Sequence, residues 1–202
     1  MRRANAPSEV RLGVARSCRS RARWLTCVLL LGLVCPMHVL ASEALDALIG
    51  EATALRTSDP KRVDALLDQM SGMLAGATTV QRDQVRILRA HRMMTSGQSA
   101  RAIEELTDLL SSTADPVARF ETASMLANVY AVQRRFEDSL RMLETMLPVA
   151  EQVGDAQLRH RGLMVAAIVY NQVGEFRLAR QYAERVLRDD PAGRNACAAG
   201  GV

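Results

Sequence analysis

The sequence predicts an all-α protein built from helix–turn–helix repeats, and three observations lead to that expectation. A spaced pattern of small and aromatic residues occurs in residues 126–143 and again in residues 166–183. Aromatic residues make up only 3% of the chain, and no stretch alternates between apolar and polar side chains as a half-buried strand does. Glycines and Asp-Pro pairs recur where such helices must end and begin.

The first 41 residues are expected to be a targeting segment. They hold seven of the 26 basic residues but only one of the 22 acidic residues. An apolar run at residues 24–34 follows the arginines, and Val39 and Ala41 fit the positions that precede a cleavage site. Because a helix needs roughly 20 apolar residues to span a bilayer, a cleaved signal peptide is predicted, with an uncleaved membrane anchor as the alternative.

The distribution of charge and of cysteines argues against a nucleic-acid partner and against disulfide or cysteine–metal chemistry. Outside residues 1–41 acids slightly outnumber bases, so the net charge of +4 does not indicate a nucleic-acid partner. Cys18, Cys27 and Cys35 lie in the targeting segment, and cleavage would leave Cys197 alone. The mature chain is therefore expected to contain no disulfide and no cysteine-based metal site.

The repeat spacing places four hairpins on residues 42–191, the predicted helical repeat domain. The first helix of each hairpin is predicted at residues 45–57, 82–96, 117–133 and 157–173. The second helix is predicted at residues 61–75, 99–112, 136–152 and 176–189. Each hairpin leaves an apolar face uncovered, so the next hairpin is expected to cover it, which stacks the hairpins in chain order.

Small residues recur where the two helices of each hairpin should cross. The first-helix column is Thr53, Ala90, Ala127 and Ala167, and the second-helix column is Ala65, Ala102, Ser139 and Ala179. Both columns advance by 37, 37 and 40 residues. Because small side chains let two helix backbones approach, we expect Ala90, Ala127 and Ala167 to face Ala102, Ser139 and Ala179 across the last three hairpins.

The expected turns carry matching residues. Gly97 and Gly174 stand where first helices must end, and glycine tolerates the left-handed conformation found there. Asp-Pro pairs at 59–60 and 115–116 stand where helices begin, since Asp caps free amides and Pro fits the first helical position. Arg134 replaces the turn glycine of the third hairpin, so that turn is expected to be looser or differently shaped.

These residues resemble the tetratricopeptide repeat family. The resemblance covers about residues 43–191 and is strongest in the last two hairpins. The matching positions there include Tyr130, Phe136, Ser139, Tyr170, Phe176 and Ala179. The tryptophan that opens the family's motif is absent, and Arg56 and Met93 stand at the tyrosine position of the first two hairpins. The resemblance implies a right-handed α-solenoid of three to four repeats that follows the signal segment.

The long step between the last repeats is also similar to the exported repeat regions of bacterial signalling proteins such as membrane-bound diguanylate cyclases. This implies a non-catalytic scaffold that binds a protein or peptide in the bacterial envelope. The expected location is periplasmic or secreted, with inner-membrane anchoring through the N-terminal segment as the alternative. The rival function is a truncated sensory input region of such a cyclase. No cyclase motif occurs in this chain, so that activity does not carry over.

The C-terminal residues depart from the repeat pattern. A fifth helix should begin after the Asp-Pro pair at 190–191, yet residues 192–202 allow only about three turns and include Gly200 and Gly201. We expect this segment to be truncated or frayed. A short native protein completed by a partner is the alternative, and the oligomeric state is left open.

No residue set in the sequence indicates catalysis. Of the three histidines, His38 lies in the targeting segment, and His91 and His160 belong to hairpins that are two units apart. The chain has no His-x-x-x-His pair, no glycine-rich phosphate loop and no Gly-x-Ser-x-Gly motif. We therefore predict that the protein is not an enzyme and uses no cofactor or metal.

The family resemblance implies a concave groove lined by the first helices of the hairpins. By position match, the groove residues are Gln84, His91, Glu121, Ser124, Asn128, Arg161, Met164, Asn171 and Gln172. Asn128 stands where the family often holds the backbone of a bound peptide. The alternative is that these positions are simply solvated surface residues.

Two further residue sets could contribute to binding. Arg82, Arg86, Arg89 and Arg92 step by three and four along one helix face, and they are predicted to form a solvated stripe or a dock for an acidic segment. The methionines of the repeat region are predicted to fill the helical core, with a methionine-lined peptide groove as the alternative.

Overall fold

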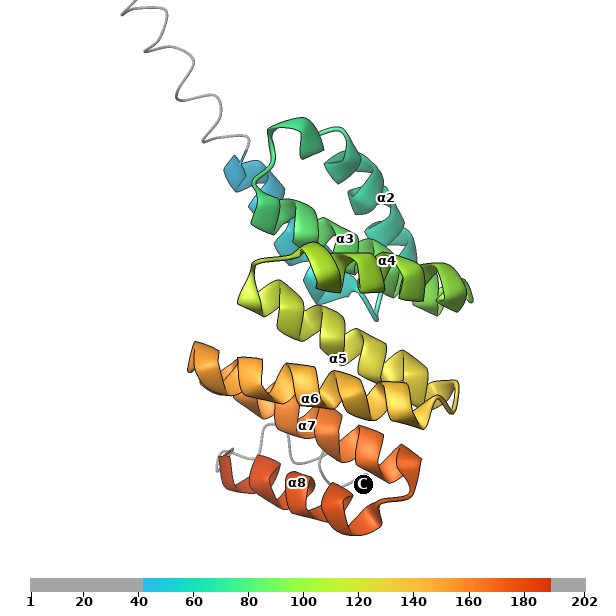
Figure 1. Ribbon diagram of the computed structural model, residues 1–202. Helices are drawn as coiled ribbons and strands as arrows, with labels where there is room; N and C mark the ends of the chain where they lie inside the picture. Colours follow the sequence, from blue (N-terminus) through green and yellow to red (C-terminus); the bar gives the residue numbers. More distant parts are fainter. Residues whose placement is uncertain (1–41, 190–202) are drawn as a thin grey trace, which may run out of the picture. The chain divides into compact units, whose positions relative to one another are not determined.

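The computed structural model describes residues 42–189, which form eight α-helices and no strand within that range (Figure 1). The first helix covers residues 42–55. The labelled helices are α2 (Pro60–Ser71), α3 (Thr79–Thr95), α4 (Ser99–Ser112), α5 (Pro116–Val132), α6 (Phe136–Val153), α7 (Ala156–Val173) and α8 (Phe176–Asp189). The prediction of an all-α fold is confirmed. The predicted signal segment, residues 1–41, and the predicted frayed end, residues 192–202, lie outside the described residues.

The helices pack as sequential pairs. Helix α3 pairs with α4, α5 with α6, and α7 with α8. Each later pair also packs on the one before it, since α5 contacts both α3 and α4, and α7 contacts both α5 and α6. From α2 to α8, the helices therefore follow one another in chain order through the stack (Figure 1).

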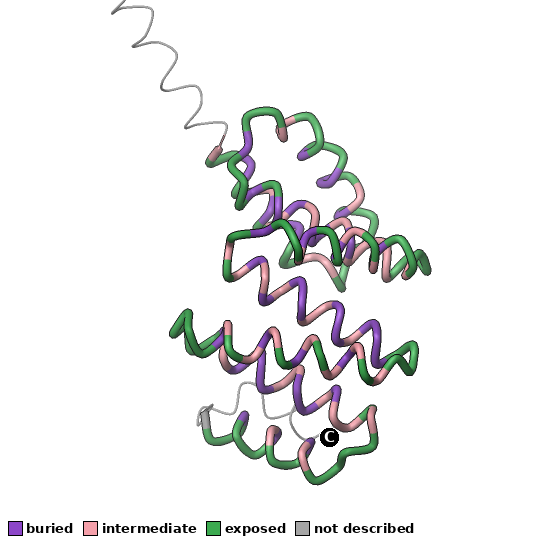
Figure 2. Tube along the Cα trace, viewed as in Figure 1, coloured by how far each residue is buried: buried purple, intermediate pink, exposed green. Residues whose placement is uncertain are grey.

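The first helix of a pair is buried on more sides than the second. Nine of the 17 residues of α5 are buried, against four of the 18 residues of α6. Figure 2 shows the same contrast along the tube, where buried positions are denser on α5 than on α6. This follows from the packing, because a first helix touches its own partner and also the preceding pair.

The helix boundaries are close to those predicted, with one clear exception. Helix α2 was expected to reach residue 75, but it ends at Ser71 and is followed by a 3-10 turn, η1 (Leu74–Gly76). Gly72 and Gly76 explain the early end, because glycine in a helix interior costs about 1 kcal/mol relative to alanine.

Side-chain caps begin the helices at the predicted Asp-Pro pairs. The carboxylate of Asp59 accepts a hydrogen bond from the N–H of Arg62 at 3.0 Å, and Asp115 accepts one from Ala118 at 2.9 Å. Helix α7 begins at a cap that the sequence analysis did not single out, Asp155, whose carboxylate accepts from two backbone N–H groups. Each cap satisfies donors that have no partner inside the helix.

The turns inside the last three pairs share one shape. Gly97, Arg134 and Gly174 have φ values of 82°, 61° and 91°. In each turn the following N–H donates to the carbonyl five residues earlier, from Gln98 to Met93, Arg135 to Tyr130 and Glu175 to Tyr170, at 2.8, 2.8 and 2.9 Å. This is the hydrogen bond of a Schellman cap. The expectation of a different turn at Arg134 is wrong, because the arginine adopts the left-handed conformation that glycine takes elsewhere.

The small-residue columns face each other in the last three pairs. The alanines of both columns there, Ala90, Ala102, Ala127, Ala167 and Ala179, are at most 1% exposed. The fully buried Ser139 hydroxyl donates to the carbonyl of Ala127 at 2.7 Å, which brings α6 directly onto α5. The close approach predicted for these pairs is thus observed.

The first pair departs from this register. Thr53 and Ala65, which belong to the two small-residue columns by spacing, are exposed. The helix at residues 42–55 instead buries Leu45, Ile49 and Ala52, which are spaced by four and three residues along one face. Thr53 is rotated by about 100° from Ala52 and therefore points away from that face.

The two repeat tyrosines pack beside corresponding side chains. Tyr130 belongs to a cluster that includes Ile103, Leu106, Leu110 and Met142. Tyr170 lines a cavity together with Leu140, Leu143, Leu147 and Tyr182, which lie at the corresponding positions 37 or 40 residues later. The third and fourth pairs are therefore related in packing as well as in sequence.

Candidate functional site

A groove runs across the first helices of the pairs and contains most of the predicted binding residues. It encloses about 400 Å³. Six predicted residues line it: His91, Glu121, Ser124, Asn128, Arg161 and Met164. The remaining lining residues are Arg56, Thr57, Ile87, Met94, Met125 and Val165. They come from α3, α5, α7 and the turn that follows the helix at residues 42–55.

The groove is built from equivalent positions on successive helices. Glu121, Ser124 and Asn128 are spaced by three and four residues, so they share one face of α5. His91 on α3 lies 37 residues before Asn128, and Met164 on α7 lies 40 residues after Ser124. The repeat spacing thus brings side chains that are far apart in the sequence onto one continuous surface.

Three predicted residues do not line the groove: Gln84, Asn171 and Gln172. Gln84 is half-buried near the start of α3. Gln172 lies in the last turn of α7, about 16 Å along the helix axis from Arg161. Asn171 is rotated from the face of Arg161 by roughly a quarter turn. These three residues match the family pattern by position, but they lie outside the stretch of each helix that lines the groove.

The charged pair of the groove joins two neighbouring repeats. The guanidinium of Arg161 on α7 donates to Glu121 Oε1 on α5 at 2.8 Å. The same guanidinium lies 5.6 Å from the centroid of the Phe120 ring, within cation–π range. Because the two charges neutralise each other, Arg161 is held in place by the fold and contributes little net charge to the groove.

An asparagine in the middle of the groove is oriented by its own helix. The side-chain amide of Asn128 donates to the carbonyl of Ser124 at 3.1 Å. Since an asparagine side chain carries a carbonyl oxygen as well as an amide, this bond leaves Oδ1 as an acceptor. The groove therefore presents a fixed acceptor that suits a backbone N–H.

A cation without a counter-ion lies at the other end of the groove. Burial, together with the nearby positive charge of Arg56, holds the pKa of His91 below its usual 6.5. The imidazole is therefore neutral at pH 7. Within residues 42–189 no carboxylate pairs with Arg56. The net electrostatic character of the groove is consequently positive at this end.

The apolar surface of the groove is largely methionine. Met94, Met125 and Met164 all line it. By contrast, Met70 and Met146 are fully buried in the core. Core filling is thus confirmed for these two methionines. Met94, Met125 and Met164 also pack against core clusters while they line the groove, and the methionine-lined peptide groove stays a prediction.

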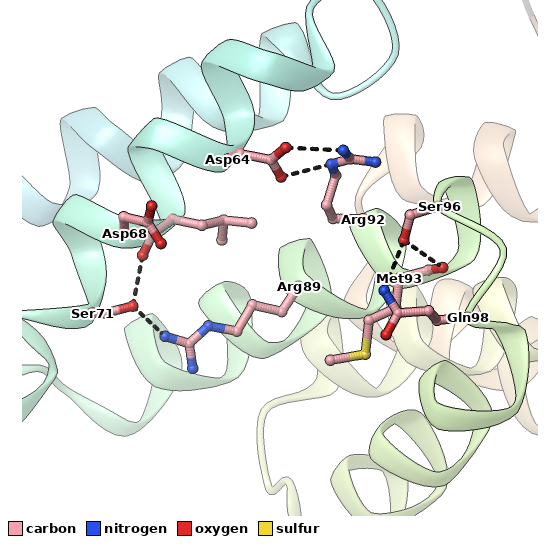
Figure 3. A pocket seen from close by; sticks show the side chains of 9 residues that line it. Asp64, Asp68, Ser71, Arg89, Arg92, Met93, Ser96 and Gln98 are labelled. Carbon is pink, nitrogen blue, oxygen red and sulfur yellow. Dashed lines mark hydrogen bonds and ion pairs between the residues drawn. The ribbon is translucent and has the colours of Figure 1, made fainter.

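A second hollow of about 400 Å³ lies between α2, α3 and the start of α4 (Figure 3). Here Arg92 makes two hydrogen bonds to the carboxylate of Asp64, at 2.6 and 2.9 Å. The hydrogen bond from Arg92 lowers the pKa of Asp64 below its usual value of 3.8. Arg89 donates to the hydroxyl of Ser71 at 2.6 Å. Figure 3 shows both guanidinium groups reaching from α3 toward α2.

The arginine stripe therefore serves the fold. In addition to the contacts of Arg89 and Arg92, Arg86 forms ion pairs with Glu105 and Asp108 on α4. Arg82 donates to the carbonyl of Ala77 at 2.6 Å. The predicted stripe is partly solvated, since Arg82 is exposed and the other three arginines are half-buried. Neighbouring helices and the preceding loop also supply partners for all four guanidinium groups, which the sequence analysis did not predict.

Sequence reasoning missed half of the groove lining. Ile87 could have been found, because it lies 37 residues before Ser124 and so occupies the same column. Arg56 and Thr57 could not, since they follow the end of a helix whose register differs from that of the other repeats. Within the described region there is no cluster of His, Cys, Asp and Glu that could hold a metal ion, and no helix is both long and apolar enough to cross a bilayer.

Comparison with known proteins adds no family assignment. No protein-family model, curated protein or solved structure matches the chain. The functional argument is accordingly built on the geometry of the groove and on the repeat pattern.

Proposed function

We propose that this protein is a non-catalytic scaffold that binds an extended segment of another protein in the groove across α3, α5 and α7. The observation that carries the proposal is the convergence of His91, Asn128 and Arg161 on one groove from three successive repeats. An elongated surface made of equivalent positions suits a ligand that runs across the helices and contacts each repeat in turn.

The chemistry of the groove suggests how such a segment would be held. The free Oδ1 of Asn128 would accept a hydrogen bond from a ligand backbone N–H. Met94, Met125 and Met164 would cover apolar side chains of varied shape. Arg56 would attract an acidic residue, because no carboxylate of the described region neutralises it. The proposed ligand is therefore an apolar peptide with an acidic residue at one end.

We further propose that the stack is a right-handed solenoid of the tetratricopeptide repeat type. The constant hairpin turn, the paired small residues and the packing of each first helix on the preceding pair support this. We also propose export to the periplasm or the medium, on the strength of the N-terminal sequence alone. N-terminal sequencing of the exported protein should then start at or near Ser42, and a start at Met1 would contradict cleavage.

The binding proposal is tested with peptides selected on the full chain by phage display. Replacing Asn128 with Ala, or Arg56 with Ala, should weaken the selected peptides about tenfold or more, since each change removes roughly 1.5–3 kcal/mol of charge-assisted or buried hydrogen bonding. Arg177→Ala, an exposed position on α8, is the matched control and should leave binding unchanged. Equal affinities for all three variants and the parent would reject this groove.

A further inference from the structure

A cavity separate from the groove lies between α6 and α8, and it encloses about 630 Å³. Helix α7 lies between these two helices (Figure 1) and contributes Tyr170 to the cavity. Tyr170 is nine residues, or two and a half turns, beyond the groove residue Arg161, so it points to the opposite side of α7. The cavity therefore shares no surface with the groove.

The cavity combines apolar walls with hydrogen-bond acceptors. The rings of Tyr170 and Tyr182 stack within it, with their centroids 5.4 Å apart. Leucines form the walls, and Glu144 and Glu175 both line the cavity. Pro148 has no N–H to donate to the carbonyl of Glu144 four residues earlier, which leaves that carbonyl without its helical partner. No arginine, lysine or histidine of the described chain is part of the lining.

The preceding repeat shows what fills the equivalent space. There the guanidinium of Arg135 lies 4.2 Å from the centroid of the Tyr130 ring, and it also pairs with Asp138 at 2.8 Å. Tyr130 is consequently only 8% exposed. The position that corresponds to Arg135 in the next repeat, 40 residues later, is Glu175. The last repeat therefore has the same tyrosine, but a carboxylate occupies the sequence position of the arginine that covers the tyrosine in the preceding repeat.

We propose that this cavity binds an arginine side chain of a partner protein. The guanidinium would lie against the tyrosine rings as Arg135 lies against Tyr130, and it would donate to Glu144 and Glu175. The aliphatic stem of the arginine would pack on the leucine walls.

The electrostatics of the cavity agree with a cationic ligand. Burial raises the pKa of Tyr170, and the nearby Tyr182, Glu144 and Glu175 raise it further. One nearby cation, Arg185, lies 5.5 Å from the centroid of the Tyr182 ring, but it faces Glu151 at 3.8 Å and is not part of the cavity lining. The field within the cavity is therefore negative.

The test uses an acetylated, amidated peptide Gly-Leu-Arg-Leu-Gly and its citrulline counterpart, which has the same shape without the charge. Each is titrated into the full chain while the tyrosine ring signals are followed by NMR. The arginine peptide should shift the signals of Tyr170 and Tyr182 and bind at least tenfold more tightly than the citrulline peptide. Tyr130 should not respond, because Arg135 already covers it.

A substitution inside the chain tests the same contact. Glu175→Arg should place the protein's own guanidinium in the cavity and abolish the shifts, whereas Glu184→Arg, an equal charge change at an exposed position of α8 outside the cavity, should keep them. The proposal is overturned if the two peptides act alike, if neither shifts the signals at millimolar concentration, or if the Glu175 variant binds like the parent. The proposal is also overturned if the parent chain self-associates and does not respond to the arginine peptide, and Glu175→Arg merely makes it monomeric.

Discussion

The turn at Arg134 offers the sharpest test of the repeat geometry, because an arginine there adopts a conformation that suits glycine. Its φ of 61° falls in the same left-handed region as the 82° and 91° of Gly97 and Gly174. The side chain is exposed and makes no hydrogen bond or ion pair with another described residue. Arg134→Gly should therefore relieve backbone strain without removing a contact.

Two opposing effects set the change in the free energy of unfolding. Removing the β-carbon relieves a strain of about 1–2 kcal/mol, which an L-residue bears in the left-handed conformation. Glycine is also more flexible in the unfolded chain, which destabilises the folded state by about 0.5–1 kcal/mol. We expect Arg134→Gly to raise the free energy of unfolding by about 0.5–1 kcal/mol. For a folded region of this size, that corresponds to a rise in Tm of about 1–4 °C.

Equilibrium unfolding in urea measures the effect, and two companion variants define it. Arg134→Ala keeps a β-carbon in the left-handed region and should change stability little. Gly174→Ala is the reverse kind of change and should destabilise the protein by about 0.5–1 kcal/mol, the strain of the left-handed conformation less the entropy that glycine loses on folding. No clash adds to this cost, because an added β-carbon there would meet no atom within 4 Å. The reasoning is refuted if Arg134→Gly is neutral or destabilising while Gly174→Ala carries its expected cost.

Three further changes probe the packing and the groove. Ser139→Leu should destabilise by about 1–3 kcal/mol in urea unfolding, because Ser139 is fully buried where α6 meets α5; stability equal to the parent would contradict the close approach. Phe120→Ala should cost about 3–5 kcal/mol by the same measurement, since the ring is fully buried, and a loss below 1 kcal/mol would place the ring outside the core. His91 takes up a proton less readily in the folded than in the unfolded chain, so the free energy of unfolding should fall as pH drops below 6.5 and level off below the folded pKa. His91→Gln should flatten this dependence, and an unchanged pH profile would show that the pKa of His91 is not lowered in the folded chain.

The sequence predicted the helices well because local chemistry decides where they begin and end. Asp59 and Asp115 cap the helices expected to follow them, and Gly97 and Gly174 adopt the left-handed conformation expected of them. The prediction for the turn at Arg134 failed because the three turns have the same shape, and that shape requires a left-handed residue at this position even where the residue is not glycine. Packing of the surrounding helices imposed that conformation, and local propensity gave no indication of it.

The repeat spacing did not predict which residues of the first helix pair are buried. Thr53 and Ala65 fit the spacing of the small-residue columns, but α2 ends early at Ser71 and the first helix buries Ala52 instead. A spacing rule derived from the better repeats assumes equal helix lengths. Where a glycine shortens one helix, the crossing point moves, and the rule selects residues one position off the buried face.

Side-chain partners across helices were the other gap. The one acid on α3, Asp83, lies three residues before Arg86, but it is buried and accepts a hydrogen bond from Thr113 instead. The acids that engage Arg86 and Arg92, namely Asp64, Glu105 and Asp108, belong to α2 and α4. For the groove, position matching found six of the lining residues, but it misplaced Gln84 near the start of α3 and Asn171 and Gln172 at the end of α7.

The most direct test of the account is a crystal structure of the full chain with the tightest peptide selected on it. We predict that the peptide lies across α3, α5 and α7, that its backbone N–H donates to Asn128, and that its acidic residue meets Arg56. A peptide seated on the second helices alone, or one that leaves Asn128 and Arg56 in contact with solvent only, would contradict the claim that successive first helices form the binding surface.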